Sequence, residues 1–138
     1  MNTNKILIGG IVGGIAYFLM GWLVYGLLFV DYWNANFNQC AMNPEGEMIW
    51  WALILSNLAS GFLLAFIFSW SKTSGWLAGA KVAAIVAFIM YTAIDLGFYS
   101  MSTMYSGFDV VVVDVIVGTV FTAIVGALIG LAMGLVKK

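Results

Sequence analysis

The chain has 138 residues, of which 64% are hydrophobic and 8% are charged, and its formal net charge is -1. These few polar residues are not enough to cover the surface of a water-soluble protein of this length. The composition therefore predicts a membrane protein. The chain has no Arg and no basic run, which excludes nucleic-acid binding because that function needs clustered cations. Its single cysteine, Cys40, excludes an internal disulfide.

Four apolar segments follow one another, each long enough to cross a bilayer as a helix. We expect one domain over residues 1–138, with spans at about 6–30, 48–70, 76–100 and 109–136, outer loops at 31–47 and 101–108, and an inner turn at 71–75. The first apolar run is too long for the core of a signal peptide, so we interpret it as a retained span. The valine-rich start of the last segment favours a strand in water, but lipid requires backbone hydrogen bonds within the segment, so we expect a helix.

The charged side chains sort to opposite sides of these segments. The lysines lie at both ends of the chain and near the inner turn, namely Lys5, Lys72, Lys81, Lys137 and Lys138. The acidic residues cluster around the two outer loops, namely Asp31, Glu45, Glu47, Asp95, Asp109 and Asp114. Because short cytoplasmic loops retain lysine, we expect both termini and the inner turn on the cytoplasmic side. The predicted fold class is an all-α membrane protein, with four transmembrane helices in an antiparallel bundle, in the cell membrane (the inner membrane for a bacterial source).

Aromatic residues mark the same two boundaries, because Trp and Tyr prefer the interface between lipid and water. The outer boundary is indicated by Trp33, Trp50, Trp51, Tyr99 and Tyr105. The inner boundary is indicated by Trp70 and Trp76. Each boundary is therefore indicated twice, by charge and by aromatic content.

Small residues recur at a spacing of four in every span. Those that we expect at helix contacts are Gly10, Gly14, Ser56, Ser60, Gly126 and Gly130. This spacing lets helix backbones approach closely, and close packing replaces the hydrophobic force that is missing between helices in lipid. Two readings remain open, namely packing within one four-helix bundle and contact with a second copy or another membrane protein.

Asp95 and Asp114 are the most informative polar residues, because carboxylates inside a membrane commonly mark a proton, cation or polar-substrate site. They are nearly equidistant from Met104 in the second outer loop, so an antiparallel hairpin brings them to similar depth, with Tyr91 nearby. If they lie close together, their repulsion favours a shared proton. A hydrocarbon core of about 20 residues, counted from the inner ends, places both near the outer edge. The alternative is therefore two ordinary interface residues in hydrated or hydrogen-bonded settings.

Asn57 is the deepest strongly polar side chain of the predicted bundle. An amide in lipid needs partners, and such groups commonly join two helices. We therefore expect an interhelical hydrogen bond from Asn57, with Ser56, Ser60 or a tyrosine of another span as candidate partners.

Sulfur-containing side chains form a weaker group at the outer side. Soft thiolate and thioether ligands select Cu(I), and the candidates for such a site are Cys40, Met42, Met101 and Met104. Methionine is abundant throughout the chain, with eight residues, so we expect no bound metal and keep these four only as weak candidates.

The segment from Gly21 to Trp33 resembles the end of the first span in a family of four-helix integral membrane proteins of bacteria and fungi, the domain of unknown function 1761. The matching residues, spaced every four positions, are Gly21, Tyr25, Phe29 and Trp33. The chain departs from the pattern at three positions, where an aromatic residue, a proline and a glycine are common, namely Val24, Leu27 and Val30. The resemblance implies a fold, because the family has no established activity.

The chain has no His, no phosphate-cradling glycine loop and no nucleophile with an evident base, so we expect neither catalysis nor a cofactor. Two classes of non-catalytic function remain. The first class is a non-catalytic bundle that packs with itself or serves as an accessory subunit of a larger membrane complex, surrounded by the lipid bilayer. The alternative is an oligomeric transporter or channel for protons, cations or small solutes that uses Asp95, Asp114 and Asn57.

Overall fold

A computed structural model describes residues 2–43 and 47–136 and consists of helices joined by short connections. The elements, in chain order, are α1 (Thr3–Leu23), the π-helix η1 (Val24–Leu28), α2 (Val30–Asn36), the 3-10 helix η2 (Gln39–Ala41), α3 (Trp50–Trp70), α4 (Trp76–Met101) and α5 (Phe108–Leu135). Four helical segments are long and apolar enough to span a membrane, namely 3–28, 50–70, 76–101 and 108–135. The predicted all-α bundle of a multi-pass membrane protein is confirmed, including a helix through the valine-rich start of α5.

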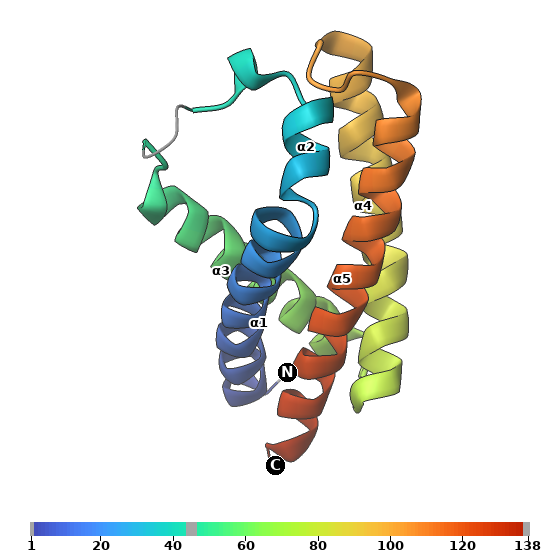
Figure 1. Cartoon of the computed structure of the whole chain (residues 1–138). Coiled ribbons are helices and arrows are strands. Elements are labelled where there is room, and N and C mark those ends of the chain that lie inside the picture. Colours follow the sequence, from blue (N-terminus) through green and yellow to red (C-terminus); the bar gives the residue numbers. More distant parts are fainter. Residues whose placement is uncertain (1, 44–46, 137–138) are drawn as a thin grey trace.

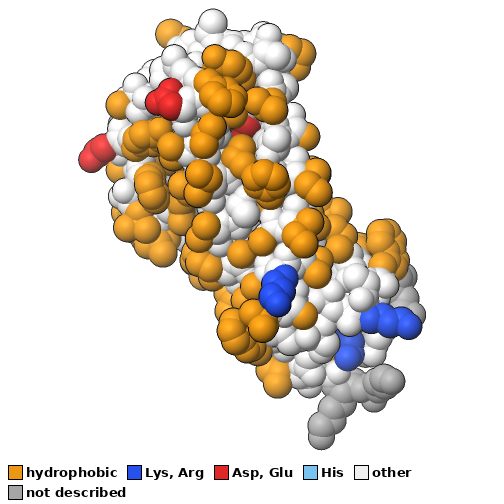
Figure 2. Space-filling view, turned by 90° about the vertical axis from the view of Figure 1, so that its right-hand side faces the viewer, with side chains coloured by type: hydrophobic (Ala, Val, Ile, Leu, Met, Phe, Trp, Pro, Cys, Tyr) orange, Lys and Arg blue, Asp and Glu red, His pale blue; other side chains and the backbone are white. Residues whose placement is uncertain are grey.

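The four spans run alternately up and down, so α1 begins and α5 ends at the same end of the bundle (Figure 1). Figure 2 shows basic side chains toward one end of the molecule and acidic ones toward the other, with apolar side chains covering much of the surface between them. Glu45, Lys137 and Lys138 lie outside the described residues. The separation of charge that the sequence indicates is therefore present along the bundle axis, and its assignment to cytoplasm and exterior stays a prediction.

The spans pack as two pairs, α1 with α3 and α4 with α5, and the pairs are joined mainly by α1 against α5. Contacts between α3 and α4 are very few. In Figure 1 the outer start of α3 stands away from α4 and α5, and the helix leans back toward them at its inner end. The bundle is thus closed along three helix pairs and loosely closed along the fourth.

Glycines make the close contacts of the inner half. A side chain at Gly61 of α3 would overlap the backbone of α1 at Gly10, Gly13 and Gly14, and Gly79 of α4 similarly faces the backbone of Gly126 in α5. The adjacent α5 position Gly130 faces the backbone at Gly75 and Gly79. These positions must lack a side chain because helix backbones touch there.

The first span ends differently from the prediction. Its last turn is a π-helix in which the Phe29 N–H donates to the Val24 carbonyl at 2.9 Å, and α2 then continues through residues expected in the outer loop. The reason is packing, because α2 buries Trp33, which is 5% exposed, against the second outer loop. The two outer loops also meet through an isolated antiparallel bridge between Phe37 and Tyr105. The expected loop 31–47 is therefore partly helical and docked on the bundle.

Candidate functional site

Asp95 and Asp114 occupy equivalent places on the paired helices α4 and α5. Asp95 lies six residues before the end of α4 at Met101, and Asp114 lies six residues after the start of α5 at Phe108. At about 1.5 Å per residue, both are about 9 Å from the outer helix ends. Their exposed fractions are only 3% and 7%. Protein covers both carboxylates, so the hydrated setting does not apply, whereas the alternative of interface residues in hydrogen-bonded settings stays open.

Two tyrosine hydroxyls hold Asp114. The Tyr25 hydroxyl donates to Oδ1 at 2.9 Å, and the Tyr105 hydroxyl donates to Oδ2 at 3.4 Å. Each carboxylate oxygen of Asp114 thus accepts a hydrogen bond from a different part of the chain. Because hydrogen bonds to an ionised acceptor are stronger than neutral ones, this arrangement suits a carboxylate with a fixed position.

An aromatic cluster, defined as Tyr25, Trp33, Phe37 and Tyr105, positions these hydroxyls. Tyr25 stacks on Trp33 with ring centroids 5.4 Å apart, Trp33 stacks on Phe37 at 4.8 Å, and Phe37 meets Tyr105 edge to face at 5.1 Å. Tyr25 itself projects from the π-helix η1, a local feature that is frequent at functional sites. The wider helical turn and α2 therefore bring the outer loops over the carboxylates.

Tyr105 is the only member of the cluster that connects both acids. Its hydroxyl lies close to Asp95 as well as to Asp114. Burial, together with the two nearby carboxylates, raises the pKa of Tyr105 above the ordinary range for tyrosine. Tyr105 therefore keeps its proton and acts as a hydrogen-bond donor between the two acids.

Asp95 is less completely satisfied than Asp114. Its Oδ2 atom is buried and has no hydrogen-bond partner among the described residues. No salt bridge compensates its charge in that part of the chain, and Lys81, on the same helix, is 14 residues away, about 21 Å along the axis. A buried polar atom without a partner calls for a specific explanation, such as a bound ion or ligand.

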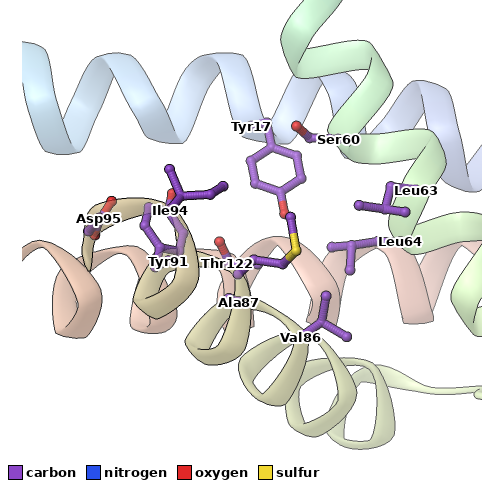
Figure 3. A pocket seen from close by; sticks show the side chains of 11 residues that line it. Tyr17, Ser60, Leu63, Leu64, Val86, Ala87, Tyr91, Ile94, Asp95 and Thr122 are labelled. Carbon is purple, nitrogen blue, oxygen red and sulfur yellow. The ribbon is translucent and has the colours of Figure 1, made fainter. Parts of the chain in front are cut away.

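A cavity of about 270 Å³ lies beside Asp95, between α3 and α4. Its polar lining comes from all four spans, namely Tyr17, Ser60, Tyr91, Asp95 and Thr122. The remaining lining is apolar, and Figure 3 shows Asp95 at one end with Tyr17 and Thr122 farther along. Thr122 Oγ1 is also buried without a hydrogen-bond partner among the described residues. The cavity therefore joins an unpartnered carboxylate to a mainly apolar space.

Of the other residues that the sequence indicated, Tyr91 belongs to this site and Asn57 does not. Tyr91 lines the cavity, and its ring lies against Gly118 of α5, where a side chain would overlap it. The Asn57 side chain donates to the Leu53 carbonyl of its own helix at 2.8 Å and lines a separate apolar cavity beside α1. The expected interhelical hydrogen bond is wrong, because the preceding turn of α3 supplies the acceptor.

The expected small-residue contacts are used unequally. Gly10 and Gly14 face Phe62 and Leu58 of α3. Ser56 and Ser60 donate to carbonyls of their own helix, and Ser60 also lines the cavity beside Asp95. The glycines thus shape helix contacts, whereas Ser60 belongs to the candidate site.

The four sulfur side chains proposed as weak Cu(I) ligands differ in burial. Met104 packs against the aromatic residues under the second outer loop, whereas Cys40, Met42 and Met101 are exposed. Among the described residues, no group of three or more His, Cys, Asp or Glu could hold a metal ion. A Cu(I) site therefore stays a weak prediction.

Sequence reasoning missed Tyr25, Tyr105 and Thr122 as members of this site. Tyr105 served only as an interface marker, and Tyr25 entered only through the four-residue spacing that it shares with Trp33. That spacing is the one signal that pointed to Tyr25, because it places both aromatic rings on one side of a helix. Nothing comparable in the sequence singles out Thr122.

Comparisons of the chain with models of protein families, with curated proteins and with solved structures give no match. The resemblance at the end of the first span therefore stays a prediction about fold. The function has to be argued from the site itself.

Proposed function

We propose that the protein is an oligomeric membrane transporter or channel whose Asp95 binds a proton, a cation or a cationic solute. The observation that carries the proposal is the buried Asp95 Oδ2 atom, which has no partner among the described residues and stands at the end of a cavity. A buried carboxylate is strongly unfavourable unless it is paired or neutralised, so a positive ligand or a proton is the natural complement of Asp95.

Asp114 has a different role in this proposal. Because Tyr25 and Tyr105 satisfy both of its oxygens, it serves as a fixed negative charge that strengthens cation binding at the neighbouring Asp95. The two acids are near enough for electrostatic interaction. A cation or a proton at Asp95 relieves their repulsion. Asn57, which lies elsewhere, has no part in the site.

The alternative of a non-catalytic accessory subunit loses part of its support. It depended on rows of small residues, and Gly10, Gly14, Gly126 and Gly130 are buried against helices of the same chain. The remaining support is the exposed apolar surface of every span, which lipid also accounts for. An oligomer stays part of the proposal, because four short spans seldom enclose a pathway alone.

Ion flux in proteoliposomes tests this function. We expect the purified protein to carry protons or alkali cations above the rate of empty liposomes, and Asp95→Asn to lower that flux at least about tenfold, the equivalent of about 1.4 kcal/mol. Asp109→Asn is the matched control, because Asp109 is an exposed acid in the first turn of α5, the helix that pairs with the Asp95 helix α4. Flux that is unchanged in Asp95→Asn would overturn the proposal. A stable hetero-complex without flux would favour the accessory role.

A further inference from the structure

We infer that the cavity beside Asp95 takes an amphiphilic amine in its protonated form, which enters sideways from the outer half of the membrane. The inference rests on the cation-binding role proposed for Asp95 and names the class of cation. Its two requirements are a positive head group at Asp95 and an apolar body that extends toward the middle of the membrane.

The rim and the floor of the cavity differ in exposure. Met90 and Ile94 of α4 and Leu63 of α3 are 44%, 48% and 47% exposed, so they stand at a lipid-facing rim. Leu64 and Ala87, deeper in the same lining, are 1% and 3% exposed. The opening follows the sparse contact between α3 and α4. A ligand dissolved in the membrane can therefore reach Asp95 without passing through the aromatic cluster.

The length of the cavity matches an extended amphiphile. Ala87, Tyr91 and Asp95 follow one another at a spacing of four along the cavity face of α4. The eight steps from Ala87 to Asp95 correspond to about 12 Å of helix. Asp95 lies at the outer end, so a bound ligand has its head group outward and its apolar body inward, as a lipid of the outer leaflet does.

The chemistry of the lining favours an organic cation over a metal ion. Hard cations such as Ca²⁺ require six to eight oxygen ligands, and the polar groups of this lining are few and spread along its length. An apolar body fills the mainly apolar cavity through van der Waals contacts, the same interactions that pack helices together in lipid. The ring of Tyr91, one helical turn from Asp95 in the same lining, adds an aromatic surface near the head group. An ammonium group with N–H donors also satisfies Asp95 Oδ2 directly.

Binding of radiolabelled octylamine to the protein in nanodiscs tests this inference. Octylamine carries a charged head at neutral pH, and its length suits the cavity. We expect saturable binding above that of empty nanodiscs, at least about tenfold weaker binding of the neutral analogue octanol, and a similar loss in Asp95→Asn. Asp109→Asn is expected to bind octylamine normally. Equal affinity for octylamine and octanol would overturn the inference.

The apolar body is tested in the middle of the cavity, between Asp95 and the inner lining residues. Ser60→Leu fills space in the lining, and we expect it to weaken octylamine binding at least about tenfold. Ser56→Leu is the matched control, because Ser56 lies one turn away on the same helix and outside the lining. Unchanged affinity in a folded Ser60→Leu protein, checked by circular dichroism, would contradict the inference.

Methylamine and Na⁺ separate the two proposals. If either competes for Asp95 as strongly as octylamine does, the cation site stands and the amphiphilic ligand is wrong. If none of the three cations binds in an Asp95-dependent manner, the amphiphilic ligand is wrong, and if Asp95→Asn also leaves proton flux unchanged, both proposals fail. If unlabelled octylamine displaces the radiolabelled octylamine and neither methylamine nor Na⁺ does, both proposals are supported.

Discussion

The inner and outer halves of the bundle are built on opposite principles. In the inner half, glycines such as Gly61, Gly79 and Gly126 bring helix backbones into contact, and buried apolar side chains such as Ile129 fill the remaining space. In the outer half, two carboxylates are buried under an aromatic cluster, and α3 departs from α4 beside a cavity. The inner half therefore holds the helices together, and the outer half keeps energetically unfavourable buried polar groups in place.

Such a division is expected for a functional site in a membrane protein. Buried carboxylates and an open cavity lower stability, so a rigid and apolar half is needed to tolerate them. The outer half contains the unpartnered atoms Trp33 Nε1 and Asp95 Oδ2, and the π-helix that carries Tyr25. The comparison predicts that substitutions in the inner half act on stability alone, whereas those in the outer half act on ligand binding as well.

The largest expected effect is that of Gly61→Ala. A methyl group there would overlap the α1 backbone, which is less able to move than a flexible side chain, so we expect a loss of about 3 kcal/mol in the free energy of unfolding. Gly97→Ala is the control, because nothing lies within 4 Å of the added atom, and its better helix propensity gives a gain of up to about 1 kcal/mol. Unfolding in mixed micelles followed by circular dichroism measures both. Equal stability of the two variants would show that the helices are not in backbone contact.

Removal of the Tyr25 hydroxyl is expected to have an intermediate effect. Tyr25→Phe deletes a 2.9 Å hydrogen bond to the buried Asp114 carboxylate, at a cost of about 2 kcal/mol. Tyr105→Phe is expected to cost less, because its bond to Asp114 is longer at 3.4 Å. The same unfolding measurement compares the two variants with Tyr32→Phe, whose hydroxyl has no described bond to either acid. A larger loss for Tyr105→Phe would reverse the assigned order.

The smallest effect is a dependence of stability on alkaline pH. Because burial raises the pKa of Tyr105 in the folded protein, the folded state holds this proton more tightly than the unfolded state does. The stabilisation that Tyr105 gives the folded state through this proton is fully present below the unfolded pKa of about 10 and is lost as the pH rises above it. We expect Tyr105→Phe to make the fall in stability above about pH 10 less steep. An unchanged slope would place Tyr105 in water.

The sequence predicted the spans well because their signals are local. Four runs of apolar residues and the sorting of lysines from acids require no knowledge of which helices touch. Asp95 and Asp114 are nearly the same number of residues from the second outer loop, which correctly predicted a similar depth for both, because α4 and α5 form a hairpin.

The pairing of helices and the satisfaction of polar groups could not be predicted in the same way. Apolar residues surround most of each span, so hydrophobic periodicity does not show which helix packs against which. The Asn57 side chain donates a hydrogen bond to a carbonyl of its own helix, and the spacing of residues in the sequence does not distinguish such a bond from one between two helices. The burial of Asp114 depends on Tyr25, 89 residues away in the chain, and on a π-helix with no sequence signature.

The most direct test of the different roles of the two acids is the free energy of unfolding of the wild-type protein, Asp95→Asn and Asp114→Asn, each with and without octylamine. Without ligand, we predict that Asp95→Asn is more stable than wild type, because it removes an uncompensated buried charge, and that Asp114→Asn is less stable. Octylamine at about 100 times its Kd should stabilise the wild type by about 2.7 kcal/mol and leave Asp95→Asn unchanged. A destabilised Asp95→Asn protein that octylamine still stabilises would contradict the assignment of Asp95 as the cation-binding residue.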